Sequence, residues 1–313
     1  MSMDAASEKT TGELFGSLWQ RLDDAQYKES VELFTKRFQA NGFDLGWFKG
    51  KTCLDAGCGS GRYGVAMALH GAAAVTGCDI SDNGLATARE RAASIRNLTF
   101  KKGSVLDLPF ADAGFDFVCC AGVLHHTPSI ARGLDELTRV LKPGGKLFLL
   151  LYGAGGLRWK LISALRPIAG ELGLDTVDAG IAAAGLPANN RKHFLDDLFV
   201  PIQTLTTWSD LSGWLGERGY TDVQRWMKGR FDQEASPRAQ IEDMVKLERI
   251  FSGVRDAKDA PVRAKTLGTI GAQVASAFVG QARSLTETEH DAAKVEDVVI
   301  GEGNHRVLAT RGR

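Results

Sequence analysis

A glycine-rich stretch around residue 57 contains the residues whose types and spacing are suited to chemistry. A short apolar run ends in Asp55, and glycine then occupies every second position, at Gly57, Gly59 and Gly61. Glycine suits a tight turn at this place because it accepts positive φ and lets the backbone approach a ligand closely. The residues that follow the turn, 63–70, have a helical pattern. This order predicts a strand, a ligand-facing turn and the start of a helix.

Gly59, Gly61 and Gly64 also fit the dinucleotide-binding pattern Gly-x-Gly-x-x-Gly. Sites of that type leave the turn open to a pyrophosphate group. Asp55, two residues before Gly57, would repel a phosphate at the helix N-terminus, where an anionic ligand is otherwise favoured. A NAD-dependent oxidoreductase is therefore the alternative, and a glycine turn without a ligand is the purely structural interpretation.

An acid also ends the second expected strand. Asp79 lies 18 residues after Gly61, and a carboxylate at this place can accept hydrogen bonds from both ribose hydroxyls of an adenosine. Ile80 beside it offers an apolar surface to the adenine ring. Ser81 or Asp82 is expected to cap the helix that follows.

Strand-like and helix-like segments alternate along the first half of the chain. Apolar runs predict strands at 52–56, 74–79, 98–102, 115–121 and 146–152. Helical patterns predict helices at 63–70, 85–95 and 130–141. Two further strands are expected at 221–227 and 305–310. The alternation is typical of an α/β protein with a doubly wound, mostly parallel sheet.

Several ordered motifs in this region resemble those of the class I S-adenosylmethionine-dependent methyltransferases. They are the acid and glycine turn at 55–61, Asp79, Val-Leu-His-His-Thr-Pro at 123–128, Arg-Val-Leu at 139–141 and Lys-Pro-Gly-Gly at 142–145. The last three motifs resemble those of the small-molecule branch of the family, which includes quinone and natural-product enzymes. The resemblance implies a seven-stranded Rossmann-like sheet with helical insertions and S-adenosylmethionine as the cofactor. It also implies that the glycine turn faces the methionine part and that Asp55 helps to fix the turn and the amino group.

The resemblance also implies where the adenine lies. Family members commonly carry an acid directly after the glycine that follows the third strand, where this chain has Ser104. Ser104 contacts the adenine amino group, or Asp107 reaches it, or the contact is absent. The expected cofactor-binding residues are Asp55, Gly57, Gly59, Gly61, Asp79, Ile80, Ser104, Val105, Asp107 and Ala121.

Methyl transfer from a sulfonium needs positioning and the exclusion of water, so neither a nucleophilic side chain nor a metal is expected. A general base is needed only if the acceptor must lose a proton. In some relatives a histidine after the fourth strand takes that proton, which points to His125 here and then to His126. The alternative is that the pair caps or packs against the next helix. His193, close to Asp196 and Asp197, is a third candidate, with a solvated loop as the alternative.

Composition limits the other possibilities. Lys+Arg and Asp+Glu both number 38 in 313 residues, so the chain lacks the basic excess of nucleic-acid-binding proteins. The five cysteines fit neither zinc knuckles nor a disulfide framework, and they suggest reduced core thiols in a cytoplasmic protein. The longest dense apolar run, 147–152, is too short to span a bilayer.

We therefore expect five parts along the chain. They are an N-terminal helical cover at 1–48, a cofactor-binding core at 49–152, a helical lid insertion at 153–204, the remainder of the sheet at 205–231 and 297–313, and a helical insertion at 232–296. The cover includes a helix over 13–40, which in relatives often closes over the cofactor.

The two insertions leave alternatives open. Residues 154–174 form a basic amphipathic helix, which we interpret as a lid over the acceptor, with contact to a membrane surface as the alternative. Small residues at 268, 271, 275 and 280 allow close helix packing, either in a hairpin on the sheet or in a homo-oligomer contact.

The function expected from these features is methyl transfer from S-adenosylmethionine to a small or amphipathic metabolite. The alternatives are the NAD-dependent oxidoreductase and a non-catalytic S-adenosylmethionine-binding module that acts through its inserted helices.

Overall fold

The computed structural model describes residues 10–16, 23–186, 188–228 and 236–313. The chain divides into two compact units. The first unit comprises 1–152, 201–229 and 304–313, and the second comprises 153–200 and 230–303.

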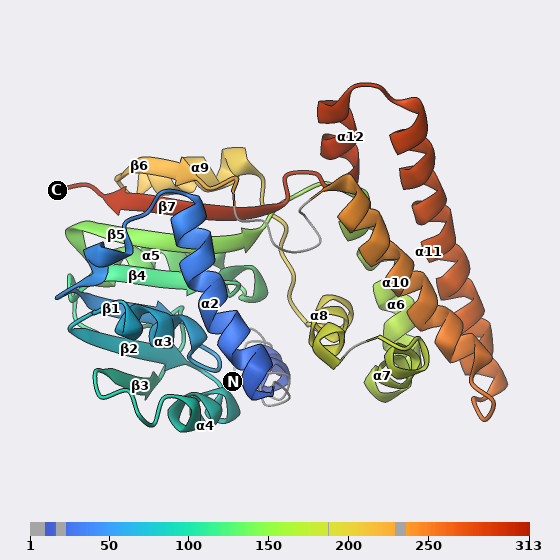
Figure 1. The fold of residues 1–313 in the computed structure, drawn as a ribbon, viewed down its shortest axis with the longest axis horizontal. Helices are drawn as coiled ribbons and strands as arrows, with labels where there is room; N and C mark the ends of the chain where they lie inside the picture. Colours follow the sequence, from blue (N-terminus) through green and yellow to red (C-terminus); the bar gives the residue numbers. More distant parts are fainter. Residues whose placement is uncertain (1–9, 17–22, 187, 229–235) are drawn as a thin grey trace. The chain divides into compact units, whose positions relative to one another are not determined.

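The first unit is built on a seven-stranded sheet with the order β3-β2-β1-β4-β5-β7-β6 (Figure 1). The strands are β1 Thr52–Ala56, β2 Ala74–Asp79, β3 Leu98–Lys102, β4 Phe115–Ala121, β5 Leu141–Tyr152, β6 Tyr220–Arg225 and β7 Asn304–Arg311. Strands β3, β2, β1, β4 and β5 run parallel, and β7 runs antiparallel to both β5 and β6. The doubly wound, mostly parallel sheet expected from the sequence is confirmed.

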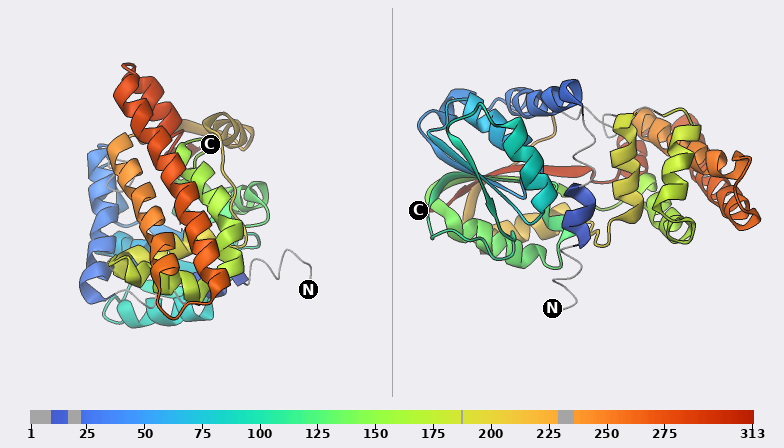
Figure 2. Two further views of the ribbon diagram at one scale, coloured as in Figure 1. Left: turned by 90° about the vertical axis from the view of Figure 1, so that its right-hand side faces the viewer. Right: turned by 90° about the horizontal axis from the view of Figure 1, so that it is seen from below.

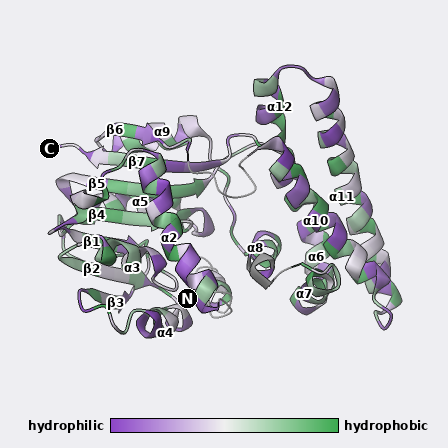
Figure 3. Ribbon diagram, viewed as in Figure 1, coloured by the Kyte–Doolittle hydropathy of each residue, from purple (hydrophilic) through white to green (hydrophobic). Residues whose placement is uncertain are grey.

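Helices cover both faces of this sheet, and each face has its own apolar core (Figure 2). One face is covered by α2 Asp24–Ala40, η1 Leu45–Phe48, α3 Arg62–Leu69 and α4 Asp82–Arg91. The other is covered by α5 Ile130–Val140 and α9 Trp208–Glu217. Strands buried on both faces read as continuous apolar runs, and β4 and β5 are largely hydrophobic in Figure 3. A short 3-10 turn, η2 Leu124–His126, follows β4.

Two helix boundaries differ from those expected. The helix expected over 13–40 is interrupted, because α2 begins at Asp24 with a capping box made by Asp23 and Gln26. Residues 10–16 are helical by themselves, and 17–22 lie outside the described residues. The helix expected at 85–95 is α4, which starts three residues earlier because the Ser81 side chain accepts the N–H of Gly84.

The second unit consists of helices. They are α6 Leu157–Leu172, α7 Leu174–Ala183, α8 Ala188–Phe199, α10 Pro237–Asp256, α11 Val262–Thr288 and α12 Ala292–Val299. Residues 297–303, expected to belong with the sheet, lie in this unit, and 297–299 are the end of α12. Of the helices that the structure describes, none has both the length and the apolar character needed to cross a bilayer.

Three of the four small residues of α11, Gly268, Gly271 and Ala275, are buried inside the unit, whereas a Cβ on Gly280 would meet nothing within 4 Å. A Cβ on Gly268 would lie 2.7 Å from the backbone nitrogen of Arg255 and 2.9 Å from the carbonyl oxygen of Phe251, both on α10. Helices α10 and α11 therefore approach closely along this face, and they also pack against α7 and α6 respectively. The hairpin thus belongs to the helical unit and not to the unit that contains the sheet.

The apolar side of α6 is also buried inside the second unit. Leu157, Leu161 and Leu165 are almost fully buried. Arg158 is buried too, and Arg166 donates to the carbonyl oxygens of Asp197 and Val200. The apolar face is therefore covered by the unit's own helices and is not presented to a membrane surface.

Candidate functional site

The glycine turn between β1 and α3 has the conformation that its sequence predicts. Gly57 and Gly61 have backbone φ angles of 74° and 78°, which residues with a Cβ atom rarely adopt. A Cβ on Gly57 would also collide with the side chain of Val123, which follows β4. The backbone at the carboxyl ends of β1 and β4 can therefore stay close together only because residue 57 is glycine.

Asp55 holds the turn from inside. Its side chain is 3% exposed, and Oδ2 accepts the N–H of Gly64 at 2.8 Å in the first turn of α3. Burial raises the pKa of Asp55 to about 7. The third glycine of the dinucleotide pattern thus has its amide engaged by a carboxyl group, so this amide does not face a pyrophosphate.

Asp79 connects the end of β2 to the same turn. Oδ2 accepts the N–H of Gly59 at 2.7 Å, and Oδ1 accepts the N–H of Ser81 at 2.8 Å. Burial raises the pKa of Asp79. Each carboxylate oxygen has a further lone pair with which to accept a hydroxyl donor. Asp79 and Ile80 are both half-buried, and the structure brings them next to the glycine turn, as expected.

The N-terminal part of the chain lies against this site. Within residues 10–16, a Cβ on Gly12 would come within 2.6 Å of Ile80 Cγ2, and one on Gly16 would come within 3.2 Å of Asn83 Cβ. The Tyr27 hydroxyl on α2 donates to the carbonyl oxygen of Ser60 in the glycine turn, at 3.1 Å. The N-terminal segment and α2 therefore contact the expected cofactor site from two directions.

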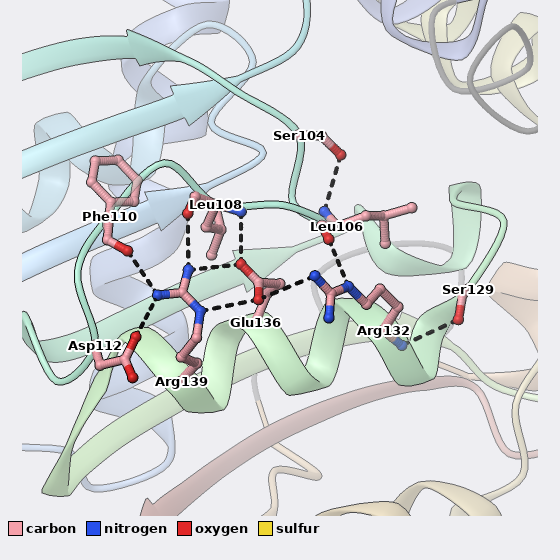
Figure 4. A network of polar contacts seen from close by, with 9 residues as sticks. All are labelled: Ser104, Leu106, Leu108, Phe110, Asp112, Ser129, Arg132, Glu136 and Arg139. Carbon is pink, nitrogen blue, oxygen red and sulfur yellow. Dashed lines mark hydrogen bonds and ion pairs between the residues drawn. The ribbon is translucent and has the colours of Figure 1, made fainter. Parts of the chain in front are cut away.

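The loop after β3 is held in place by α5 (Figure 4). Glu136, which is 4% exposed, accepts the N–H of Leu108 at 2.8 Å and pairs with Arg139. Arg139 in turn donates to the carbonyl oxygens of Leu108 and Phe110. The hydrogen bond from Arg139 lowers the pKa of Glu136. In the sequence Arg139 is only part of a family motif, and in the structure its side chain fixes this loop.

The adenine-side candidates on that loop differ in position. Ser104 Oγ accepts the N–H of Leu106 at 3.0 Å, which shapes the turn at 104–107. Val105 is buried in the core, and Asp107 is exposed. Asp107 is thus the most exposed of the three, and Ser104 already accepts a hydrogen bond from within the loop.

The two histidines after β4 have different environments. His125 is fully buried, and its Nδ1 accepts the N–H of Tyr152 at 3.4 Å. Its ring stacks on that of Tyr152, with centroids 3.8 Å apart and an angle of 24°. Burial lowers the pKa of His125 well below its usual value, and the neighbouring His126 lowers it further. In His126, by contrast, Nδ1–H donates to the carbonyl oxygen of Ile202 at 2.9 Å.

Residues 201–208 lie beside these histidines and were not identified from the sequence. The Thr204 N–H donates to the carbonyl oxygen of His125, and the Thr206 N–H donates to that of Tyr152, both at 2.9 Å. His305 on β7 donates through Nε2 to the carbonyl oxygen of Thr206 at 2.7 Å. No local pattern signals this arrangement, because its partners are far apart in the chain. The segment lies along the ends of β4, β5 and β7.

His193 lies in the second unit, on α8, so the expectation of a solvated loop there is wrong. Its Nε2 lies 2.7 Å from Nη2 of Arg158 and 3.3 Å from Oδ2 of Asp243. Burial lowers its pKa, but Asp197 and Asp243 outweigh this and raise the pKa above the usual value. His193 is thus part of a buried ionic cluster that joins α6, α8 and α10.

The strand order, the glycine turn and the acid at the end of β2 define the fold of a class I, Rossmann-like methyltransferase. Residues 54–149 match the family model described as a methyltransferase domain. This part of the chain therefore is a methyltransferase domain of the class I, S-adenosylmethionine-dependent family.

Individual proteins are similar to this chain in sequence or in fold. The chain is 35% identical over 134 residues to a demethylmenaquinone methyltransferase of Staphylococcus aureus, a match that covers 42% of this chain and 54% of the relative. It thus spans about half the length of the relatives it matches. A proposed sarcosine dimethylglycine methyltransferase from Galdieria sulphuraria has the same fold, with a TM-score of 0.51, 13% identity and coverage of 96% of this chain and 97% of that one.

Proposed function

We propose that the whole protein binds S-adenosylmethionine and transfers its methyl group to a small or amphipathic metabolite. The observation that supports this most directly is Asp79, whose carboxylate joins the end of β2 to the glycine turn. When bound, the cofactor supplies a methyl group on a positively charged sulfur, which leaves as a neutral thioether. The protein has to align the acceptor with that methyl group and keep water away.

The residues present fit this cofactor. The turn at Gly57 and Gly61 has no side chains to block the close approach of the methionine part, and the buried Asp55 carboxyl accepts the N–H of Gly64 just after the turn. Each carboxylate oxygen of Asp79 can still accept one hydrogen bond from a ribose hydroxyl. Ile80, half-buried beside it, would contact the adenine.

The adenine side rests on weaker contacts. Val105 would contribute apolar packing below the ring, since it is buried at the start of the loop that α5 holds. Ala121, at the end of β4, would line the floor between cofactor and acceptor. A contact from Ser104 would have to replace its hydrogen bond to Leu106.

The relative's name suggests which acceptor to test first. The Staphylococcus aureus protein is a demethylmenaquinone methyltransferase, and we propose an acceptor of similar chemistry, an apolar ring that carries oxygen. Aromatic side chains near the histidine pair support this, since Phe15 and Tyr152 lie 5.0 Å from His126 and 3.8 Å from His125 between ring centroids. We also propose that the protein works in the reducing cytoplasm, because its five cysteines are buried and free.

Transfer of a tritiated methyl group tests the proposal. The protein is incubated with S-[methyl-³H]adenosylmethionine and a bacterial metabolite extract, and the organic phase is counted. We expect labelled product with the wild type and a large loss with Asp79→Ala. A protein that binds the cofactor and labels no extract would instead be the non-catalytic binding module.

A further inference from the structure

The ring nitrogen Nε2 of His193 lies within reach of one group that can only donate and one that can only accept. The donor is Nη2 of Arg158, at 2.7 Å, and the acceptor is Oδ2 of Asp243, at 3.3 Å. A guanidinium group keeps its hydrogens in a folded protein, and a carboxylate has none to give. The two contacts therefore need opposite states of Nε2, a lone pair toward Arg158 or a hydrogen toward Asp243.

The contacts of this cluster connect three helices of the second unit. Oδ2 of Asp197 on α8 accepts from Nη2 of Arg158 at 2.5 Å, which joins α8 to α6 in either state of the histidine. Nε of Arg158 donates to Asp243 at 2.7 Å, which joins α6 to α10. His193 is on α8, so its contact with Asp243 joins α8 directly to α10. That last contact is a hydrogen bond only when Nε2 carries a proton.

The charges that act on His193 favour this proton. The buried guanidinium of Arg158 faces the two buried carboxylates of Asp197 and Asp243, so these three groups have an excess of negative charge. Lys246 lies 3.5 Å from Oδ1 of Asp243, but its side chain is 36% exposed and its charge is screened by water. A proton on His193 compensates the excess inside the cluster.

Other charged groups lie on α8 and on the helices packed against it. They are Arg166 on α6, Asp178 on α7, and Arg191 and Asp196 on α8 itself. Arg166 donates to the carbonyl oxygens of Asp197 and Val200, and Arg191 pairs with Asp178 at 3.0 Å. The two arginines are thus engaged by these partners, and the nearest charges to Nε2 remain those of the cluster.

We infer that His193 is a proton-dependent link within the second unit: with a proton on Nε2 it binds Asp243 on α10, and without that proton it accepts a hydrogen bond from Arg158 on α6 instead. This inference concerns the helical unit and does not rest on methyl transfer. The His193 side chain is 29% exposed, so its proton can exchange with solvent while the unit stays folded. Burial lowers the pKa of His193, but Asp197 and Asp243 outweigh burial and raise the pKa above its usual value.

The sign of the pH dependence follows from this direction. The folded protein binds the proton more tightly than the unfolded chain does. The stability that the link contributes is therefore fully present below the ordinary histidine pKa of about 6.5 and is lost as the pH rises through the pKa of the folded protein. Helix α8 should open most readily above that pKa, because it loses its link to α10 and keeps its link to α6 through Asp197.

Nitrogen NMR locates the proton on His193. Long-range ¹H–¹⁵N spectra of the uniformly labelled protein are recorded from pH 5.5 to pH 9, and His193→Gln identifies the signals of residue 193. We expect a titration midpoint above about 6.5 and, in the neutral form, a proton on Nδ1, because Nε2 accepts from Arg158. A midpoint below about 6.5, or a neutral form with its proton on Nε2, would overturn the inference.

Hydrogen exchange of peptides from α8 measures the link itself. Rates at pH 6 and pH 8.5 are compared after correction for the intrinsic pH dependence of exchange. The opening constant of the wild type should rise, by about tenfold for each unit by which the folded pKa exceeds that of the unfolded chain. His193→Gln does not titrate, so its opening constant should be the same at both pH values. An equal rise in His193→Gln, or no rise in the wild type, would contradict the inference.

Matched variants complete the test. His290→Gln removes an exposed histidine of the same unit and should follow the wild type in hydrogen exchange. Asp243→Asn keeps the shape of the acceptor but not its charge, so it should lower the midpoint of His193 even if His193→Gln does not fold. Asp259→Asn, at an exposed carboxylate between α10 and α11, should leave the midpoint unchanged. Equal midpoints in Asp243→Asn and the wild type would show that Asp243 is not the partner of this proton.

Discussion

At the scale of single residues, Asp79 has two tasks. In the absence of ligand, its oxygens accept the N–H groups of Gly59 and Ser81, and in the proposed complex they also accept ribose hydroxyls. Removing the carboxylate should therefore affect both the shape of the turn and the binding of the cofactor.

Asp79→Ala should weaken S-adenosylhomocysteine binding by at least about 100-fold, since it removes two hydrogen bonds to a charged group, which contribute about 1.5–3 kcal/mol each. Equilibrium dialysis measures the change in Kd. Asp82→Ala is the matched control, because Asp82 is exposed and pairs only with the exposed Lys102 among the contacts described. Equal affinities for Asp79→Ala and Asp82→Ala would show that the second strand's acid does not hold the ribose.

Asp55 should make the protein less stable as the pH rises. Its pKa is about 7 in the folded protein against an ordinary 3.8, so the folded state holds the proton where the unfolded chain has lost it. Stability therefore falls as the pH rises from about 4 to about 7, by on the order of 4 kcal/mol. Asp55→Asn should remove this slope while the amide oxygen still accepts the N–H of Gly64.

Urea unfolding at pH 4.5 and pH 8 measures this effect. The stability of Asp55→Asn relative to the wild type should be greater at pH 8 than at pH 4.5. Asp107→Asn, at an exposed carboxylate of the same unit, should follow the wild-type curve. If Asp55→Asn also runs parallel to the wild type, the carboxyl is ionised throughout and burial does not control it.

The histidine pair shows what could not be read from the sequence at this scale. His125 and His126 are neighbours in one motif, and nothing local distinguishes them. Their environments differ because one ring meets the amide of Tyr152 and the other the carbonyl of Ile202, 27 and 76 residues away. From the sequence, His125 is the first candidate for the base and His126 the second, and these contacts show that the two rings have different hydrogen-bond partners.

At the scale of elements, the glycine turn between β1 and α3 is the part of the fold whose residue types are most strictly determined by the structure. Its positive φ values and the contact with Val123 both require glycine at residue 57. Gly50 has nearly the same φ, 76°, but a Cβ there would meet nothing within 4 Å. A substitution at Gly50 thus measures the cost of backbone strain alone, and a substitution at Gly57 measures that cost together with the collision with Val123.

Gly50→Ala should lower the free energy of unfolding by about 1 kcal/mol, the cost of a left-handed backbone with a Cβ. Gly57→Ala should lower it by a further 1–3 kcal/mol or so, because Val123 must move. Thermal and urea unfolding of both variants measure the difference. Equal losses in the two would mean that the turn has room for a side chain, and thus that it is not tightly held against β4.

The strands of the first unit were predictable because each is a short, dense apolar run between turn residues. Strands β1 to β4 have the bounds expected from the sequence. Helices α6, α10 and α11 were expected within the two helical insertions, but their packing partners were not, because periodicity shows which face is apolar and not which helix covers it. Residues 188–199 were not recognised as a helix, since two of their polar residues, His193 and Asp197, form part of a buried cluster and break the apolar pattern.

At the scale of the whole molecule, the chain consists of two compact units with separate interiors. Every expected cofactor-binding residue lies in the first unit. The second unit is held by an ionic cluster in which Arg158, 1% exposed, donates to Asp243 at 2.7 Å and to Asp197 at 2.5 Å. Breaking this cluster should therefore affect one unit and spare the other.

Arg158→Met should destabilise the second unit by about 3–5 kcal/mol, because it leaves two buried carboxylates without their partner. Hydrogen exchange of peptides from α6 and α10 measures this loss. Arg263→Met is the control, since Arg263 on α11 forms only an exposed pair with Glu171 among the described contacts. Affinity for S-adenosylhomocysteine should stay within about twofold in both variants. A parallel loss of affinity in Arg158→Met would show that the cofactor site depends on the second unit.

The central claim is that the turn at Gly57–Gly61 and the acid at Asp79 form a site for S-adenosylmethionine and not for a dinucleotide. Isothermal titration calorimetry of the intact protein with S-adenosylhomocysteine and, separately, with NAD tests it most directly. We predict one S-adenosylhomocysteine bound per chain and no heat of binding with NAD. Saturable binding of NAD, with none of S-adenosylhomocysteine, would contradict the account.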